Sequence, residues 1–301
     1  MGRTLVAASL LIALLSNPAA GLIAPSRPPR QRATTASAAT AASTPTATPR
    51  ATTTRAAAPA DDDKPAAATL KEALLDALLA WFRDSELVAA AHAKHVASDT
   101  VSHLFKGTPM AAAPDALKLR FVGDGAGRFV SDFMRREQQT LGEWKQRKVV
   151  EAAGPAFDER GALAELSDLS STAPVVVLSF VDCPWCLAAK ELLATQSSIS
   201  PEAVRVVELE ELGRQGKALR AAAALATGRT SMPNVWIGGR SVGGYTDGYD
   251  GAFDLRLVRR PELCVRSSPG LLALRDSGEL DAMLRDAERN QRTLETFMFD
   301  D

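Results

Sequence analysis

Two cysteines stand where an apolar strand pattern changes into a helical one. Residues 175–180 form an apolar run, residues 187–193 have helical spacing, and Cys183-Pro184-Trp185-Cys186 lies between them. A sulfur at a helix N-terminus meets partial positive charge and free backbone N–H groups, which favour a thiolate. The second sulfur lies about one turn further on and can close a disulfide with the first. The sequence therefore predicts a dithiol–disulfide centre.

Cysteine count and net charge exclude several classes of protein. The 301-residue chain has only one further cysteine, Cys264. Three cysteines are too few for a secreted disulfide scaffold, and a four-cysteine zinc site within one chain is excluded. The net charge of −1 predicts no nucleic-acid partner. Cys264 is interpreted as a partly buried small hydrophobe, with a regulatory thiol as the alternative.

Residues 1–65 are predicted to be a disordered targeting presequence. The first 60 residues lack Asp and Glu, and Arg3 precedes an apolar run from Leu5 to Leu15. That run has the length of a signal-peptide core, and the basic stretch after it, rich in Ala, Thr, Ser and Pro, buries too little apolar surface to fold. The segment resembles the signal-plus-transit presequences of algae with extra plastid membranes. We expect a plastid address and no mature transmembrane segment, with secretion, a mitochondrion or a tail without an address as alternatives.

Residues 66–155 are predicted to be mostly helical, with no function assigned. Helices are expected at about 70–83, opened by a Thr69–Glu72 capping box, at about 85–105 and at about 128–152. Residues 117–122 are a candidate short strand. Residues 123–127 then hint at a phosphate loop, but Arg128 replaces the third glycine of that motif, which favours an ordinary loop.

Three histidines follow one stripe of the second helix. His92, His95 and His103 are the only histidines of the chain. The first and last would lie about 16 Å apart at the standard helical rise, so no single ion can bridge them. A solvated helix face is therefore favoured, and we expect no metal site.

The C-terminal half alternates strand and helix patterns. Gly238-Gly239 suits a two-residue hairpin turn in which both residues have positive φ. A βαβ unit followed by ββα predicts an α/β fold with a mixed central sheet. The expected helices are 159–169, 187–195, 212–226 and 271–289, and the expected strands are 175–180, 204–209, 234–237 and 240–243.

Three motifs in one order resemble the glutaredoxin family, over residues of about 160–290. The strand with the cysteine pair is followed by the motif from Thr227 to Gly239 and by the motif from Val242 to Asp247, and residues 274–280 fit the last helix of the family. The resemblance covers under half of the chain. It implies that residues 156–301 form a thioredoxin-like three-layer domain, with an insertion at about 249–269.

The resemblance also implies roles for the two sulfurs. Cys183 matches the nucleophile, which attacks a disulfide or a glutathione mixed disulfide, and Cys186 matches the resolving cysteine. Ser231-Met232-Pro233 matches a segment with a cis proline, whose preceding backbone pairs with glutathione as an added strand would.

Other matched residues imply a glutathione site. Asp247 would pair with the α-ammonium group of glutathione, and a backbone N–H near Thr246 would contact its carboxylate. Arg220 falls where the family has a polar residue that reaches the glycine carboxylate, although a solvated helix face is the alternative. The expected substrate and glutathione contacts are Pro184, Trp185, Arg220, Ser231, Met232, Pro233, Gly244, Thr246 and Asp247.

Two residues depart from the family pattern. Phe180 stands where a Lys commonly lowers the pKa of the nucleophile, and Asp182 puts a carboxylate next to Cys183, which should oppose the thiolate. The insertion carries Arg256, Arg259 and Arg260, which are candidates to cover the site or to supply the missing cation.

The resemblance implies a glutathione-dependent thiol–disulfide oxidoreductase. Its partners would be glutathione and client proteins with disulfides or glutathione mixed disulfides. Phe180 and Asp182 leave open a thioredoxin-like reductase that does not use glutathione. A third hypothesis is a [2Fe–2S] carrier with glutathione ligands, against which Pro184 and Cys186 argue, since cluster binders of this family usually lack that proline.

Overall fold

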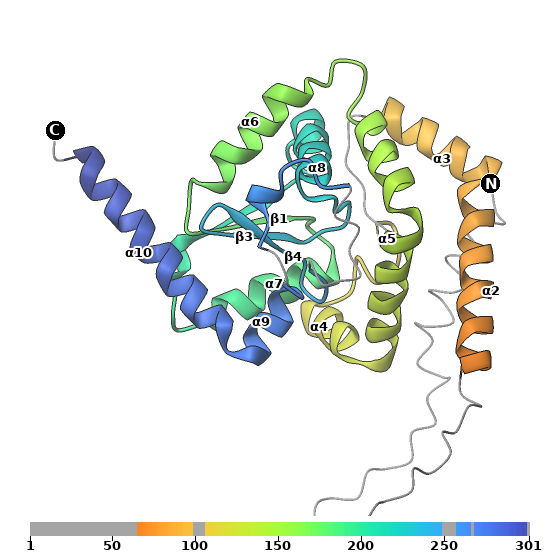
Figure 1. Ribbon diagram of the computed structural model, residues 1–301, viewed down its shortest axis with the longest axis horizontal. Helices are drawn as coiled ribbons and strands as arrows, with labels where there is room; N and C mark the ends of the chain where they lie inside the picture. Colours follow the sequence, from red (N-terminus) through yellow and green to blue (C-terminus); the bar gives the residue numbers. More distant parts are fainter. Residues whose placement is uncertain (1–64, 99–105, 249–256, 266–267, 300–301) are drawn as a thin grey trace, which may run out of the picture. The chain divides into compact units, whose positions relative to one another are not determined.

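A computed structural model describes residues 65–98, 106–248, 257–265 and 268–299 (Figure 1). Residues 73–301 form one compact unit. The predicted presequence lies outside the described residues, except for its last residue, and so does part of the predicted insertion. The predicted domain boundaries at residues 65 and 155 stay predictions. Among the described helices, none combines the length and apolarity needed to cross a membrane.

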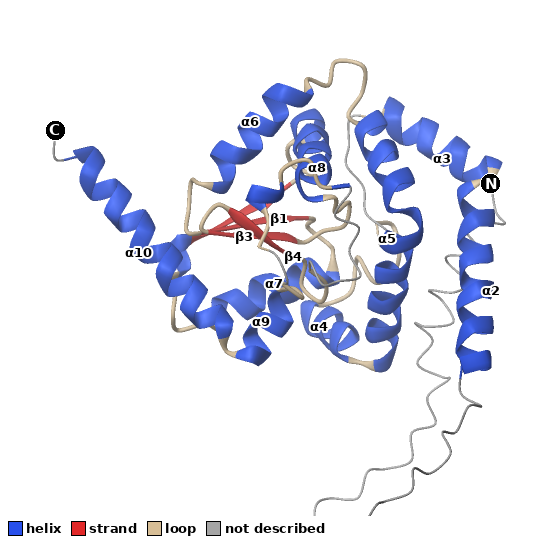
Figure 2. Ribbon diagram, in the orientation of Figure 1, coloured by secondary structure: helices blue, strands red, loops and turns tan. Residues whose placement is uncertain are grey.

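A mixed four-stranded sheet lies at the centre of this unit, in the order β2-β1-β3-β4 (Figure 2). Strand β1 (Val175–Ser179) pairs in parallel with β2 (Val204–Glu208) and antiparallel with β3 (Asn234–Ile237). Strand β4 (Arg240–Gly243) completes the sheet by pairing antiparallel with β3. Every residue of β1 is buried, as expected for a strand covered by helices on both faces. The predicted α/β fold with a mixed sheet is confirmed.

The turn between β3 and β4 is the predicted glycine pair. Gly238 has φ 57° and Gly239 has φ 74°. A type I′ turn needs positive φ at both central residues, and glycine adopts it without a steric penalty.

Helices cover both faces of the sheet. The helices α6 (Glu159–Ser170) and α8 (Gly213–Thr227) lie on one face, and α7 (Pro184–Ala194) lies on the other with α9 (Leu271–Ser277) and α10 (Glu279–Phe299) (Figure 1). The main apolar core lies between the sheet and the helices α7, α9 and α10. It includes Val175, Val177, Ala189, Leu193, Val235, Leu271, Leu280 and Leu284.

The final helix, predicted as one continuous helix over residues 271–289, is in fact two helices. Gly278 has φ 78° and ends α9, and α10 begins at the next residue. Glycine at this position terminates a helix because it enters the left-handed region freely.

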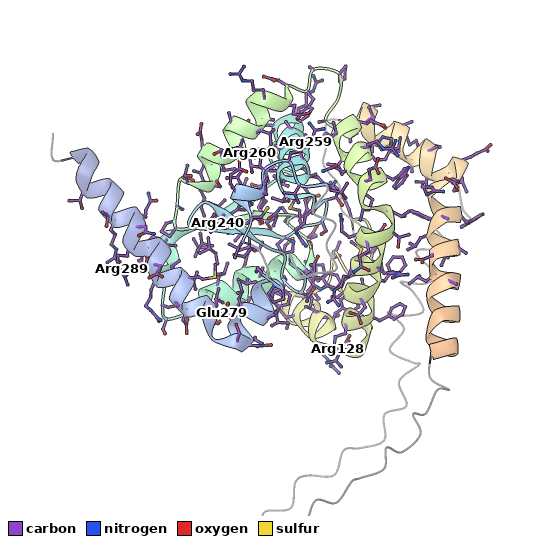
Figure 3. The ribbon with its side chains drawn as sticks, viewed as in Figure 1. Arg128, Arg240, Arg259, Arg260, Glu279 and Arg289 are labelled. Carbon is purple, nitrogen blue, oxygen red and sulfur yellow. The ribbon has the colours of Figure 1, made fainter. Side chains whose placement is uncertain are left out.

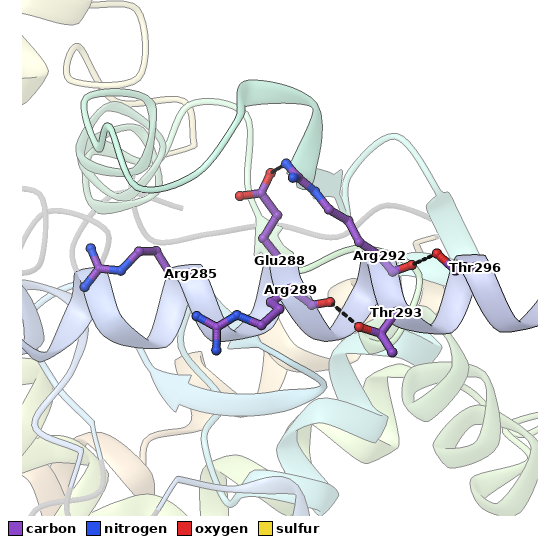
Figure 4. Close-up of a pocket in the computed structure, with 6 residues that line it drawn as sticks. All are labelled: Arg285, Glu288, Arg289, Arg292, Thr293 and Thr296. Atoms are coloured by element: carbon purple, nitrogen blue, oxygen red, sulfur yellow. Dashed lines mark hydrogen bonds and ion pairs between the residues drawn. The ribbon is translucent and has the colours of Figure 1, made fainter.

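Further along α10, a hollow is lined by residues of that helix alone, namely Arg285, Glu288, Arg289, Arg292, Thr293 and Thr296 (Figure 4).

The region before the sheet is helical, as predicted, but its boundaries differ. Helix α2 spans Pro65–Arg83, so Thr69 lies inside the helix and the predicted capping box is wrong. Proline is well suited to the first helical position, and the alanines after it favour the helix. Helix α3 (Glu86–Ala97) begins after Ser85, whose Oγ accepts from the N–H of Leu87 at 3.3 Å. The remainder of the predicted second helix, 99–105, lies outside the described residues.

The candidate strand at 117–122 is wrong, because these residues belong to helix α4 (Asp115–Gly123). Helix α4 packs against α7, and Lys118, Phe121 and Val122 are its buried residues. Their spacing of three and four places them on one helical face. A tertiary contact thus decides a segment whose local pattern is ambiguous.

Residues 123–127 are helical except for Asp124, so the ordinary loop favoured there is wrong, and the phosphate loop that it was weighed against is not formed either. Asp124 caps helix α5 (Gly125–Ala152), since its Oδ1 accepts from the N–H of Gly127 at 2.9 Å. A Cβ on Gly127 would collide with the carbonyl of Phe121. Glycine is therefore required for the close approach of the two helices.

The two described histidines take different environments. Nε2 of His92 lies 3.1 Å from a carboxylate oxygen of Glu151. His95 is half-buried, and burial, with Lys217 nearby, lowers its pKa to about 4, so the predicted solvated face is wrong for this residue. His103 lies outside the described residues. Within the described part of the chain, no three His, Cys, Asp or Glu side chains gather in a way that could hold a metal ion.

Candidate redox site

Cys183 is the N-cap residue of α7, as the sequence predicts. Its φ of −78° and ψ of 120° are extended, and Pro184 occupies the first turn of the helix. The N–H of Cys186 donates to Sγ of Cys183 at 3.4 Å. The free N–H groups of the helix start therefore face the sulfur that is expected to carry negative charge.

The two thiols differ in their acidity. Hydrogen bonding from the Cys186 side chain lowers the pKa of Cys183, with help from the backbone N–H groups of Cys186 and Trp185 and from Lys190, against the opposing effect of burial. Burial raises the pKa of Cys186 well above its usual range. Both cysteines are free thiols, and Cys183 is 5% exposed while Cys186 is 0% exposed. One reactive and one protonated thiol are what an attacking and a resolving cysteine require.

The surroundings of Asp182 weaken the expected effect of its carboxylate on Cys183. Its Oδ1 accepts from Nζ of Lys118 at 3.5 Å, and its side chain is 47% exposed. Lys118 comes from α4, a segment to which the sequence assigns no role. Because a cation and water both screen the carboxylate, its effect on Cys183 is weakened.

Phe180, which replaces the lysine that is common in the family, contacts the cation of Arg220 through its ring. The guanidinium of Arg220 lies 5.4 Å from the centroid of the Phe180 ring, a cation–π distance. Arg220 also donates to the carbonyl of Thr230 at 3.3 Å, and burial lowers its pKa to about 10. The alternative of a solvated helix face is therefore wrong, and Arg220 lies between Phe180 and the loop before β3.

The loop that contains Pro233 lies beside Cys183. The Met232–Pro233 peptide bond is cis, as the resemblance implies. The thiol of Cys183 donates to the carbonyl of Met232 at 3.9 Å. The structure thus brings the expected peptide-binding backbone to the reactive sulfur.

Asp247 has a partner that sequence reasoning missed. Its Oδ2 lies 2.5 Å from Nη1 of Arg229, which is 1% exposed, and Nη2 of Arg229 donates to Oγ of Ser231 at 3.2 Å. Arg229 thereby joins the loop before β3 to the loop after β4. The signal for it was a cation inside the motif from Thr227 to Gly239. Gly244 is buried against this pair, and Thr246 is half-buried.

The described arginines of the insertion bind elsewhere. Arg259 forms an ion pair with Glu159, and Arg260 forms one with Glu262. The backbone N–H groups of both residues donate to carbonyls near the end of α8, and Figure 3 labels both side chains in that part of the unit. The expectation that these two supply a cation at the site is wrong. Arg256 lies outside the described residues.

Comparisons with known proteins agree with the geometry. The sequence profile described as Glutaredoxin matches residues 175–242. A glutaredoxin of Solanum lycopersicum is 35% identical over 83 residues, which are 28% of this chain and 72% of that protein. A glutaredoxin of Pseudomonas aeruginosa is 37% identical over 75 residues, which are 25% of this chain and 79% of that protein. The chain belongs to the glutaredoxin family.

Longer relatives and solved structures match in part. Monothiol glutaredoxin-S10 of Oryza sativa is 36% identical over 95 residues, and the chain spans about half of its length, 52%, while the match takes up 32% of this chain. Glutaredoxin C1 from Populus tremula x tremuloides, in a crystal structure of its holo form, is 32% identical with a TM-score of 0.32; the match covers 43% of this chain and 91% of that one.

The candidate redox site has neighbours from helices that precede the residues matched by the family profile. Nε1 of Trp185, between the two cysteines, donates to Oγ of Ser131 on α5 at 2.9 Å. Phe121 of α4 meets the Trp185 ring edge to face, with centroids 5.7 Å apart and an interplanar angle of 80°. The helices before the sheet thus contribute side chains to the surroundings of the redox centre.

Proposed function

We propose that this glutaredoxin is a glutathione-dependent dithiol oxidoreductase that reduces protein disulfides or protein–glutathione mixed disulfides. The observation that carries the proposal is the pair of thiols at the start of α7. The pKa of Cys183 is lowered by hydrogen bonds, and that of Cys186 is raised by burial. Cys183 is therefore the attacking sulfur, and Cys186 stays protonated until a mixed disulfide has formed.

The reaction runs by two thiol–disulfide exchanges. The Cys183 thiolate attacks the glutathione sulfur of a mixed disulfide; the client leaves as a thiolate and takes a proton from water. A second glutathione thiolate then attacks the glutathione sulfur of this mixed disulfide, which gives glutathione disulfide and releases the Cys183 thiolate. Alternatively, Cys186 loses its proton and attacks Sγ of Cys183. When Cys186 attacks, an internal disulfide forms and glutathione leaves. Two further glutathione molecules supply the two electrons that restore both thiols and become glutathione disulfide.

Glutathione would lie across the two loops beside Cys183. The backbone of Met232, whose carbonyl is 3.9 Å from Sγ of Cys183, would pair with its cysteinyl part. Asp247 binds Arg229 through Oδ2 and would receive the α-ammonium group at Oδ1. Arg220, held over the Phe180 ring, would reach the glycine carboxylate of glutathione.

We also propose that residues 1–65 are a presequence that directs the protein to a plastid, for the compositional reasons given above.

A disulfide-reduction assay tests the proposal. Hydroxyethyl disulfide, glutathione, glutathione reductase and NADPH should give turnover with the full chain, and Cys183→Ser should abolish it. Cys264→Ser is the matched control, because Cys264 is buried and donates to the carbonyl of Arg260, away from α7. Unchanged turnover in Cys183→Ser would sink the assignment. Turnover with thioredoxin reductase in place of glutathione would favour the thioredoxin-like alternative, and a brown protein from anaerobic purification would favour a cluster carrier.

A further inference from the structure

Helices α4 and α5 contact the surroundings of the redox centre at two separate loops. At the first of these places, the end of the loop after β1 and the first turn of α7, Lys118 binds Asp182, and Phe121 and Ser131 contact Trp185. These contacts come from both helices and reach residues on each side of Cys183. They place the helix pair along one side of the cysteine motif.

At the second loop, one side chain of α5 makes two hydrogen bonds. Nε2 of Gln138 donates to the carbonyl of Gly228 at 2.9 Å, and its Oε1 accepts from Oγ1 of Thr230 at 3.2 Å. These residues immediately precede the segment from Ser231 to Pro233. Helix α5 therefore spans from the cysteine motif to the loop that is expected to receive an extended substrate.

The burial of the motif matches these contacts. Trp185 is 9% exposed, Phe121 is 7% exposed and Cys183 is 5% exposed. On the other side of the motif, Val181 is 45% exposed, and Tyr245 and Thr246 are partly exposed. Among the described residues, the approach that α4 and α5 leave to Cys183 thus runs past the exposed Val181 and past residues 245–246.

We propose that α4 and α5 form a built-in cover that restricts Cys183 to small or flexible disulfides. The proposal rests on the proposed function and specifies its substrate class. Transient redox encounters between folded proteins bury up to about 1,200 Å² in total, so a folded client would lay up to about 600 Å² of its own surface on this protein. The cover occupies the side where such a surface would rest. A glutathione-sized substrate or a flexible peptide needs only the remaining approach.

The experiment compares small and folded substrates in matched variants. We would measure turnover of hydroxyethyl disulfide and of a folded protein carrying one glutathione mixed disulfide. The double variant Phe121→Ala/Ser131→Ala removes one side chain of α4 and one of α5 that contact Trp185. Phe129→Ala/Asp132→Ala is its control, because Phe129 is 46% exposed and the Asp132 side chain is 72% exposed on the same helix.

The expected result is a change of substrate ratio. The first double variant should raise the folded-to-small turnover ratio about tenfold over the natural sequence, while hydroxyethyl disulfide turnover stays within about twofold and the control keeps the original ratio. A flexible peptide that carries one glutathione mixed disulfide is measured as well. If the protein with the natural sequence turns over the folded substrate as fast as this peptide, the cover is refuted. It is also refuted by an unchanged ratio in the Phe121→Ala/Ser131→Ala variant.

A second readout does not depend on catalysis. Cys183 can be labelled with iodoacetamide or with a maleimide attached to a folded protein, and the two rates compared in the same variants. A change of ratio here, without turnover of any disulfide, would contradict the proposed function and support the cover. Turnover with an unchanged labelling ratio would contradict the cover and leave the function standing.

Discussion

Nζ of Lys118 lies 3.5 Å from Oδ1 of Asp182, the residue that precedes Cys183. Lys118 is almost buried, at 6% exposed, and also lies 3.9 Å from Asp115. The ammonium group of Lys118 is therefore close enough to offset the negative charge of Asp182. The carboxylate that sequence reasoning expected to weaken the thiolate is therefore paired by a helix of the preceding region.

Removing that lysine should make Cys183 less acidic. In Lys118→Met, the charge of Asp182 next to Cys183 loses its partner, so we expect the pKa of Cys183 to rise slightly, since water still screens a half-exposed carboxylate. The pH profile of iodoacetamide alkylation measures this change. Adding Asp182→Asn should reverse it. Lys148→Met is the control, because Lys148 pairs with Glu151 at 2.7 Å. A rise that persists after Asp182→Asn would show that Lys118 acts otherwise.

The hydrogen bond from Cys186 should set the acidity of Cys183. It is the largest cause of the lowered pKa of Cys183. In Cys186→Ala the donor is lost, so the pKa of Cys183 should rise and less thiolate should be present at neutral pH. In Cys186→Ser a hydroxyl donor remains, and the rise should be smaller. The ultraviolet absorbance of the thiolate, followed against pH, gives both values. Equal titrations in the two variants would exclude the side-chain hydrogen bond as the cause.

The ion pair between Arg229 and Asp247 should respond unequally to the loss of each partner. Asp247→Ala leaves a guanidinium that is 1% exposed without its carboxylate, which should cost about 3–5 kcal/mol of unfolding free energy. Arg229→Met leaves a carboxylate that is 28% exposed and can be hydrated, so the cost should be smaller, about 1–2 kcal/mol. Urea denaturation of both variants measures the difference. The reverse order would contradict the buried position of Arg229.

Gly244 should tolerate no side chain. A Cβ there would collide with Nη2 of Arg229 and would lie 2.7 Å from Oδ1 of Asp247. Gly244→Ala should therefore disturb this ion pair and cost about 1–3 kcal/mol. Gly123→Ala is the control, since nothing lies within 4 Å of a Cβ at that position and alanine favours the helix. Thermal unfolding of both variants is the measurement; equal midpoints would contradict the close packing around Gly244.

The order of strands and helices from residue 159 to residue 243 could be predicted, because each signal is local. The β1 apolar run, the helix start at Pro184 and the Gly238-Gly239 turn depend on residues within a few positions of one another. The segment at 117–122 and the break at Gly278 could not be predicted in the same way. Residues 117–122 are helical because they pack on α7. The helix break at residue 278 depends on a single glycine in the left-handed region.

The sequence by itself determined the dithiol, its position at a helix start and the family to which it belongs. Those features are set by neighbouring residues, whose geometry follows from the backbone. The tertiary structure alone decided the pairs Arg229–Asp247, Ser131–Trp185 and Lys118–Asp182, whose members are 18, 54 and 64 positions apart. Charge pairing and hydrogen bonding act over a few ångströms, so such partners are recognised only when the folded chain brings them together.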